Sequence, residues 1–377
     1  MEEYDSIISH HQAILSETTC PDVYPPRSRD VMMQGREPYL SELAISLTNK
    51  CNIQCRHCFF GCSPLRSRDL SWEVIERVIN EASRLDHIRT IGFTGGEPFL
   101  NRNKLTRAVQ LCTGLGIEST VISNGFWALS IGKAVEVLKE LPGLRRLGLS
   151  TDSFHQEFIP IDIIRNAICA SAQLGIECTI RISHLKNPVS EIERIHQQLN
   201  EVEGLYKTQY QPVQSAGRAA KTIEASSIYQ YDVAKAICFT ADVPLIGVDG
   251  DVAACCGPAA TWGNNHLLYL GNVFKDSLGD MLRYADYNPI LHALRLWGPS
   301  ALYRFAQEQA EKEESELTIP SSMNSSCLLC KYMVSDPTAS TLLRRSIRTA
   351  NVSREIALTR LADLGETSMY LSLQSEK

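Results

Sequence analysis

Residues 43–58 read LAISLTNKCNIQCRHC. The first five are mostly apolar and predict a short buried strand, and Cys51, Cys55 and Cys58 follow it in a CxxxCxxC pattern. Three thiolates at this spacing can bind three of the four irons of a [4Fe-4S] cluster. No fourth cysteine continues the pattern, so one iron would stay open to a small molecule. An open iron indicates catalysis rather than electron storage.

Two other uses of these cysteines fit the sequence less well. Structural zinc sites usually pair two CxxC knuckles, whereas here three cysteines lie within eight residues and no His follows at finger spacing. Disulfides need an oxidising compartment, and the chain shows no charged segment followed by an apolar signal sequence. The thirteen cysteines of the chain therefore point to metal binding in a reducing compartment, and we expect a cytoplasmic protein.

The triad also resembles a known cluster loop. With Asn52 after its first cysteine and His57 and Phe59 flanking its third, it is similar to the loop of the radical S-adenosylmethionine (SAM) superfamily. The resemblance implies that the open iron binds the amino and carboxylate groups of SAM. It further implies reductive cleavage of SAM to a 5'-deoxyadenosyl radical, with electrons from an external flavodoxin or ferredoxin-type donor.

Apolar segments with strand and helix periodicity alternate along the first part of the chain. Six such units predict an α/β fold with a parallel sheet and right-handed crossovers, a partial (β/α)6 TIM-like barrel. In the first helix, apolar residues recur at helical spacing after Ser71, a candidate N-cap. The predicted strands are 43–48, 90–94, 118–122, 147–150, 178–182 and 209–213, and the other predicted helices lie near 103–113, 131–140, 161–173 and 190–201.

The second predicted strand ends in Gly95, Gly96, Glu97 and Pro98, and sites of parallel βα proteins lie at such strand ends. Glycines there let the backbone approach a ligand closely, and Glu97 can either steady the loop or accept a hydrogen bond from an ammonium group. Taken alone, the tetrapeptide is an ordinary turn. It matches the GGEP motif of the radical SAM family, and this resemblance implies that the loop receives the amino group of SAM.

Later strand ends carry further candidate SAM contacts. Asn124 follows the third strand, Ser150 and Asp152 follow the fourth, and Arg181 lies on the fifth. By resemblance, the Ser and the Asp contact the carboxylate and ribose of SAM. Arg181 could pair with the SAM carboxylate or with a structural acid. Ser, Asn and Asp are also common in turns and helix caps, so both interpretations of these residues stay open.

A second group of cysteines follows the predicted barrel. Cys238, Cys255, Cys327 and Cys330, with Gly250 between the first two, resemble the SPASM/Twitch extensions of the superfamily, which bind auxiliary [4Fe-4S] clusters. The full SPASM pattern has seven cysteines, but residues 331–377 contain none, so one auxiliary cluster is expected. Zinc binding by the same four thiols is the alternative.

Two further cysteines leave questions open. Cys256 could replace Cys255 as a ligand, because adjacent residues on a hairpin point to opposite faces. Cys62 lies four residues past the triad and could approach the cluster or be an ordinary buried thiol.

The sequence predicts four segments. These are an N-terminal lead at 1–40, the barrel at 41–222, the auxiliary cluster domain at 223–335 and a C-terminal helical tail at 336–377. The net charge of -6 disfavours nucleic acid as a partner. No apolar run approaches the length of a membrane span, so no membrane association is expected.

The substrate is predicted from the auxiliary domain. SPASM/Twitch resemblance implies a ribosomally synthesised precursor peptide that is cross-linked, excised or epimerised. Because the triad begins at residue 51, we expect no recognition domain before it and a separate peptide-recognition protein as a possible partner. The alternatives are a dehydrogenase of a small molecule in natural-product biosynthesis and, as a non-enzyme, a metal-binding scaffold.

Overall fold

The computed structural model describes residues 40–228, 236, 238, 240–320, 323 and 325–363. The predicted N-terminal lead, except residue 40, and the end of the predicted tail lie outside these residues. The chain divides into two compact units. We call them the sheet unit, described over 42–228 and 245–251, and the helical unit, described over 240–244 and 252–363 with short gaps. The return of Leu245–Asp251 to the sheet unit was not anticipated from the sequence.

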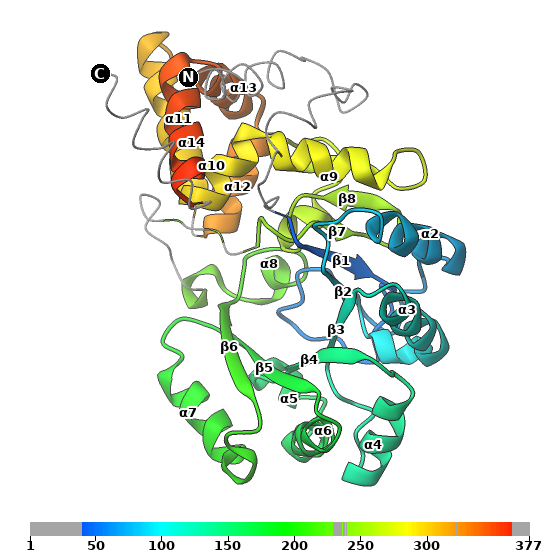
Figure 1. Cartoon of the computed structure of the whole chain (residues 1–377). Coiled ribbons are helices and arrows are strands. Elements are labelled where there is room, and N and C mark those ends of the chain that lie inside the picture. Colours follow the sequence, from blue (N-terminus) through cyan, green and yellow to red (C-terminus); the bar gives the residue numbers. More distant parts are fainter. Residues whose placement is uncertain are drawn as a thin grey trace. The chain divides into compact units, whose positions relative to one another are not determined.

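The sheet unit contains a seven-stranded parallel sheet in the order β6-β5-β4-β3-β2-β1-β7. Six strands follow the chain order, each joined to the next by a helical crossover, and β7 adds to the other side of β1 (Figure 1). The described strands do not close into a barrel, and β6 is an open edge. The strands are β1 (Glu42–Ser46), β2 (Thr90–Thr94), β3 (Glu118–Ser123), β4 (Leu144–Ser150), β5 (Glu177–His184), β6 (Lys207–Pro212) and β7 (Leu245–Ile246).

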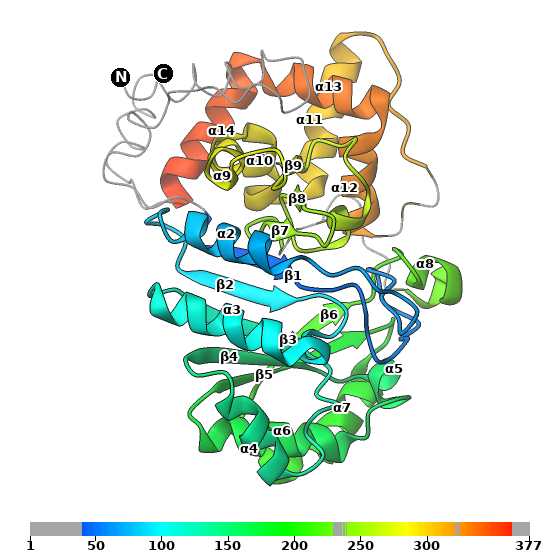
Figure 2. The same ribbon diagram turned by 90° about the vertical axis from the view of Figure 1, so that its right-hand side faces the viewer.

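The crossover helices cover the outer face of this curved sheet, as Figures 1 and 2 show. In α2, the buried residues recur at helical spacing from Val74 to Ala82, which explains why this segment folds as an amphipathic helix. Ser71 occupies the N-cap position as expected, but its side chain makes no capping hydrogen bond. The larger helices are α2 (Trp72–Ala82), α3 (Arg102–Gly114), α4 (Ile131–Lys139), α6 (Ile161–Gln173) and α7 (Val189–Gln198).

The core of the sheet unit lies along its first strands. Leu43, Ile45, Ile91 and Phe93 are completely buried, and β1 and β2 are buried along nearly their whole length. Central strands of a parallel sheet are covered on both faces and therefore read as continuous apolar runs, as residues 43–47 do. This buried platform holds the loops at the carboxyl ends of the strands.

The helical unit is built mainly from consecutive helices. Three of them begin with proline at their first residue, at Pro289, Pro299 and Pro337, where a missing backbone N–H does no harm. None of the described helices is long and apolar enough to cross a membrane. The elements are β8 (Asp251–Ala253, whose Asp251 belongs to the sheet unit), β9 (Tyr269–Asn272), α9 (Leu278–Tyr287), α10 (Pro289–Trp297), α11 (Pro299–Lys312), α12 (Ser326–Ser335), α13 (Pro337–Ile347) and α14 (Ala350–Asp363).

Candidate active site

The cysteine loop leaves the carboxyl end of β1. Its course is fixed by isolated bridges, among them Lys50 to Ser63, and by a hydrogen bond from the Cys51 N–H to the Ser63 carbonyl (3.1 Å). Cys51 and Cys55 are buried and Cys58 is half-buried. Burial, together with the charges of Glu97, Cys55 and Cys58, raises the pKa of Cys51 to about 12. Three thiols that repel one another's negative charge need a cation to become thiolates together, so the donor set fits a metal cluster.

The GGEP loop packs directly on the cysteine loop. The Gly96 N–H donates to the Thr48 carbonyl (2.7 Å) and the Glu97 N–H donates to the Lys50 carbonyl (2.9 Å). A Cβ atom added to Gly95 would lie 2.3 Å from the Thr48 carbonyl oxygen, and one added to Gly96 would lie 2.0 Å from that of Lys50. Both positions thus require glycine because the backbone that leads into Cys51 lies too close for a side chain. The sequence did not reveal this contact.

This packing makes Gly96 a sensitive position. We expect Gly96→Ala to lower the free energy of unfolding by about 2 to 4 kcal/mol and to reduce iron uptake, because the backbone of the cysteine loop must move. Gly132, inside α4, is the matched control, since an added Cβ there meets nothing within 4 Å. Gly132→Ala should leave stability unchanged or raise it by about 1 kcal/mol. Chemical denaturation of both variants is the measurement, and equal stabilities would contradict the close packing.

Glu97 ties the end of β2 to the end of β3. Its side chain is completely buried. Oε1 accepts from the Phe99 N–H (3.1 Å) and the Ser123 hydroxyl (2.9 Å), and Oε2 accepts from the Asn124 N–H (2.8 Å). Burial raises the pKa of Glu97 to about 7. Of the two roles predicted for Glu97, these hydrogen bonds fit the one in which it stabilises the loop. Pro98, the next residue, begins the short 3-10 helix η1 (Pro98–Asn101).

Asn124 reaches from β3 to the cysteine loop. Its Nδ2 donates to the Oδ1 of Asn52 (2.9 Å) and lies 3.8 Å from the Cys51 sulfur, while its Oδ1 accepts from the Phe126 N–H (3.1 Å). An amide N–H beside a cysteine sulfur stabilises the thiolate form. Asn124 and the triad, which were separate features of the sequence, are therefore brought together.

Asp152 lies just past Ser150 at the end of β4, and it is completely buried. It caps the short helix α5 (Ser153–Gln156), and its Oδ1 accepts from the His155 Nδ1 (2.9 Å). Its Oδ2 accepts from the Ser183 N–H on β5 (3.2 Å). Burial opposes ionisation, but the charge of His155 and the hydrogen bonds outweigh it and lower the pKa of Asp152 to about 2. The carboxylate thus holds protein groups together, and a contact with SAM stays a prediction.

Beyond Asp152 lies His155, whose ring packs against that of His57 in the cysteine loop with the ring centroids 4.9 Å apart, a contact that the sequence did not reveal. Ligand atoms of Cys55, His57 and His155 lie within 4.8 Å of one another. Although burial lowers the pKa of His155, the charge of Asp152 and a hydrogen bond with Cys55 raise it well above its usual value. The spacing of Asp152 and His155, three residues apart at the start of a helix, is the sequence feature that could have indicated their hydrogen bond.

Arg181 stands on β5 opposite Ser150 of β4. Its guanidinium donates to the Oε1 of Gln211 on β6 (3.3 Å), and its backbone carbonyl accepts from the Thr151 N–H (3.1 Å). The register therefore places two predicted SAM contacts, Ser150 and Arg181, side by side at the same end of the sheet.

A residue whose role the sequence did not reveal, Arg218, contacts the cysteine loop. It precedes the short helix α8 (Ala219–Thr222) and donates hydrogen bonds to backbone carbonyls of Cys55, Cys58 and Cys62. Cys62 itself is buried, and its thiol is hydrogen-bonded to Cys58.

The four predicted auxiliary ligands gather in the helical unit. Cys327 and Cys330 lie in the first half of α12, three residues apart and so on one side of the helix. Burial raises the pKa of both thiols, and the charges of Cys238 and Cys255 raise them further. Cys256 belongs to the same cluster of thiols, since its charge raises the pKa of Cys255. A buried cluster of mutually repelling thiols again fits a bound metal centre.

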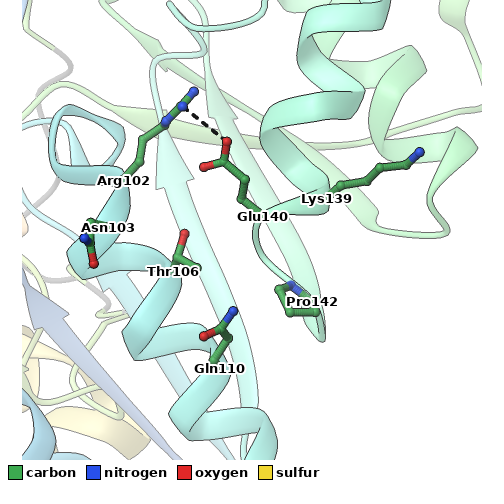
Figure 3. Close-up of a pocket in the computed structure, with 7 residues that line it drawn as sticks. All are labelled: Arg102, Asn103, Thr106, Gln110, Lys139, Glu140 and Pro142. Carbon is green, nitrogen blue, oxygen red and sulfur yellow. Dashed lines mark ion pairs between the residues drawn. The ribbon is translucent and has the colours of Figure 1, made fainter.

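The described residues also include an open groove on the outside of the sheet unit, between α3 and α4 (Figure 3). An ion pair between Arg102 and Glu140 (3.2 Å) crosses it. None of the predicted site residues lines it. The lining residues are Arg102, Asn103, Thr106, Gln110, Lys139, Glu140 and Pro142.

Comparison with known proteins agrees with this geometry. A family model described as the radical SAM superfamily matches residues 45–196, the segment that holds the cysteine triad and the GGEP loop. The chain carries a radical SAM domain. Radical SAM enzymes use SAM and a [4Fe-4S] cluster, so this chain is an enzyme with these cofactors, and Cys51, Cys55 and Cys58 are the residues that fit the cluster.

The chain has sequence relatives of two kinds. The putative peptide biosynthesis protein YydG of Bacillus subtilis is 27% identical over 300 residues, covering 78% of this chain and 91% of YydG. A GTP 3',8-cyclase of Corynebacterium glutamicum is 33% identical over 130 residues, but the match covers only 31% of this chain and 32% of the cyclase. The chain is thus similar to the cyclase over about a third of each protein, and to YydG over most of both.

Solved structures share the fold. SuiB of Streptococcus suis, bound to the precursor peptide SuiA, has a TM-score of 0.50 at 16% identity, covering 69% of this chain and 68% of SuiB. The enzyme anSMEcpe, with bound AdoMet and a peptide, also has a TM-score of 0.50, at 14% identity, covering 83% of this chain and 99% of anSMEcpe. At these identities the likeness establishes the architecture.

Proposed function

We propose that this radical SAM enzyme modifies a ribosomally synthesised precursor peptide by cross-linking, excision or epimerisation. The similarity to YydG carries this proposal. It extends over 300 residues, well beyond the 45–196 segment that defines the radical SAM domain. A match of this length has to include residues of both the sheet unit and the helical unit.

In the proposed site, Cys51, Cys55 and Cys58 hold the cluster, and the open iron takes SAM. When bound, this pair supplies a radical that removes a hydrogen atom from the substrate. The backbone of the GGEP loop would receive the amino group of SAM, and Ser150 with Arg181 would face its carboxylate. Glu97, Asn124 and Asp152 would keep the surrounding loops in place, since their polar atoms bond to protein groups.

We propose that Cys238, Cys255, Cys327 and Cys330 bind an auxiliary [4Fe-4S] cluster. Four cysteine ligands leave no open iron, so this cluster would take up the electron that remains on the substrate radical instead of binding substrate. The SAM-binding cluster needs an electron from an external flavodoxin or ferredoxin-type protein. A separate peptide-recognition protein would assist substrate binding.

The test is coexpression of the full chain with the peptide encoded beside its gene, followed by mass spectrometry. Loss of two hydrogen atoms from the peptide would indicate oxidation or cross-linking, and deuterium uptake from heavy water without that loss would indicate epimerisation. An unchanged peptide, together with oxidation of a small-molecule alcohol, would overturn the proposal in favour of a dehydrogenase. After anaerobic reconstitution, about eight irons per chain are expected for two clusters, whereas zinc without deoxyadenosine formation would indicate a metal-binding scaffold.

A further inference from the structure

The segment that follows β6 lies directly against the cysteine loop. Gly217 has a positive φ of 57°, and a Cβ atom added to it would lie 1.9 Å from the Phe59 carbonyl oxygen. Only glycine lets the two backbones approach this closely. Five residues later, the Thr222 hydroxyl donates to the Arg56 carbonyl (2.8 Å). This segment therefore lies along the cysteine loop from Arg56 to Phe59.

Arg218 makes the central contacts of this interface. Its backbone N–H donates to the Cys58 carbonyl (3.0 Å), and its guanidinium donates to the carbonyls of Cys55 (2.6 Å) and Cys62 (2.5 Å). A guanidinium is a rigid planar fork, so two carbonyls that it binds together are held at a fixed separation. The residues from Cys55 to Cys62 form neither helix nor strand, and this fork is a main constraint on their shape.

The charge of Arg218 also acts on the loop. The guanidinium is half-buried, and no carboxylate within the described residues pairs with it. It lies within hydrogen-bond distance of the carbonyls of Cys55 and Cys62, so its positive charge lies directly beside the cysteine loop. A cation that no nearby carboxylate neutralises stabilises any negative charge that is added beside it.

We propose that Arg218 is a positioning residue for the SAM-binding cluster, one that shapes the cysteine loop through its fork and raises the reduction potential of the cluster through its charge. The inference rests on the proposed ligation by Cys51, Cys55 and Cys58. Reduction transfers one electron from the external donor to the cluster and makes the cluster more negative by one charge. A nearby cation stabilises the reduced form more than the oxidised form and so shifts the potential upward.

Two substitutions in the full chain separate the two roles. Arg218→Gln removes the charge, and we expect its cluster to be harder to reduce by about tenfold, a shift of about 59 mV to lower potential for a one-electron couple. Arg218→Lys keeps the charge but has no planar fork. We expect a potential near that of the wild type, with iron lost to a chelator several-fold faster. An EPR-monitored redox titration measures the first property, and timed iron release measures the second.

Neighbouring variants provide the controls. Lys221→Gln removes an exposed charge from the same helix, and Thr222→Val removes the neighbouring contact to the Arg56 carbonyl, and neither should change the potential. A lowered potential in Arg218→Lys would refute the role of the charge. Iron release as slow as in the wild type would refute the role of the fork. Both results can be obtained from Arg218→Lys even if Arg218→Gln fails to take up iron. A wild-type chain without a reducible cluster would instead refute the proposed function, so the two failures are distinguishable.

Discussion

A chain in which Cys51, Cys55 and Cys58 are all replaced by alanine should form no deoxyadenosine from SAM under reducing conditions. The three sulfurs lie on one loop, and the open iron that SAM needs exists only when all three hold the cluster. We expect at least a thousandfold loss of SAM cleavage, because no other group supplies this redox chemistry. Deoxyadenosine is measured by chromatography, and iron should fall from about eight to about four per chain.

The matched control for this variant is Cys169→Ala. Cys169 is a half-buried free cysteine within α6, outside both predicted metal sites. This variant should retain full iron content and full SAM cleavage. SAM cleavage that survived in the triple variant would mean that the radical generator lies elsewhere in the chain.

Replacement of Cys327 and Cys330 by alanine should separate SAM cleavage from product formation. The proposed SAM-binding site belongs to the sheet unit and should stay intact, whereas the proposed auxiliary site loses two of its four thiols. We expect deoxyadenosine without modified peptide and a fall in iron to about four per chain. Iron analysis, deoxyadenosine assay and mass spectrometry of the peptide on the same sample provide the measurement.

Cys255 and Cys256 offer an internal control for the same site. Cys255 raises the pKa of Cys327 and Cys330 through its charge, so Cys255→Ala should lose the auxiliary cluster. Cys256→Ala should keep it. The reverse result would assign the ligand to Cys256. For the variant without Cys327 and Cys330, full product formation would mean that the auxiliary cluster has no electron-transfer role.

The alternation of strands and helices was predictable because it follows from the local spacing of apolar residues. One difference is the start of β4, which lies at Leu144 and not at residue 147, because Arg145 and Arg146 interrupt the apolar pattern there. In the structure, the guanidinium of Arg146 donates to the hydroxyls of Thr120 on the neighbouring strand β3 and of Thr90 on β2, the strand beyond it. Such cross-strand partners satisfy a polar residue in a strand but cannot be seen in the sequence around it.

In the candidate site, too, local motifs could be predicted from the sequence and long-range contacts could not. The cysteine triad and the GGEP loop are short motifs that can be recognised locally: residue type and spacing indicate a cluster at the triad, and resemblance to the radical SAM family implies the SAM contacts of the GGEP loop. The contacts that join them are long-range, such as the one from Asn124 to Asn52, 72 residues earlier. Asp152 shows the resulting ambiguity. Its sequence position suits both a ligand contact and a helix cap, and only the fold reveals the second partner, Ser183, on the next strand.

The contact between Arg218 and the Cys55 carbonyl, 163 residues apart, has a consequence for biogenesis. A ribosome exposes the three cysteines early, but Arg218, which holds their loop, emerges only after strands β1 to β6 have been synthesised. Contacts of such long separation form late in folding. Iron insertion should therefore follow completion of the sheet, and a nascent chain halted before Gly217 would present its cysteines without the frame that shapes them.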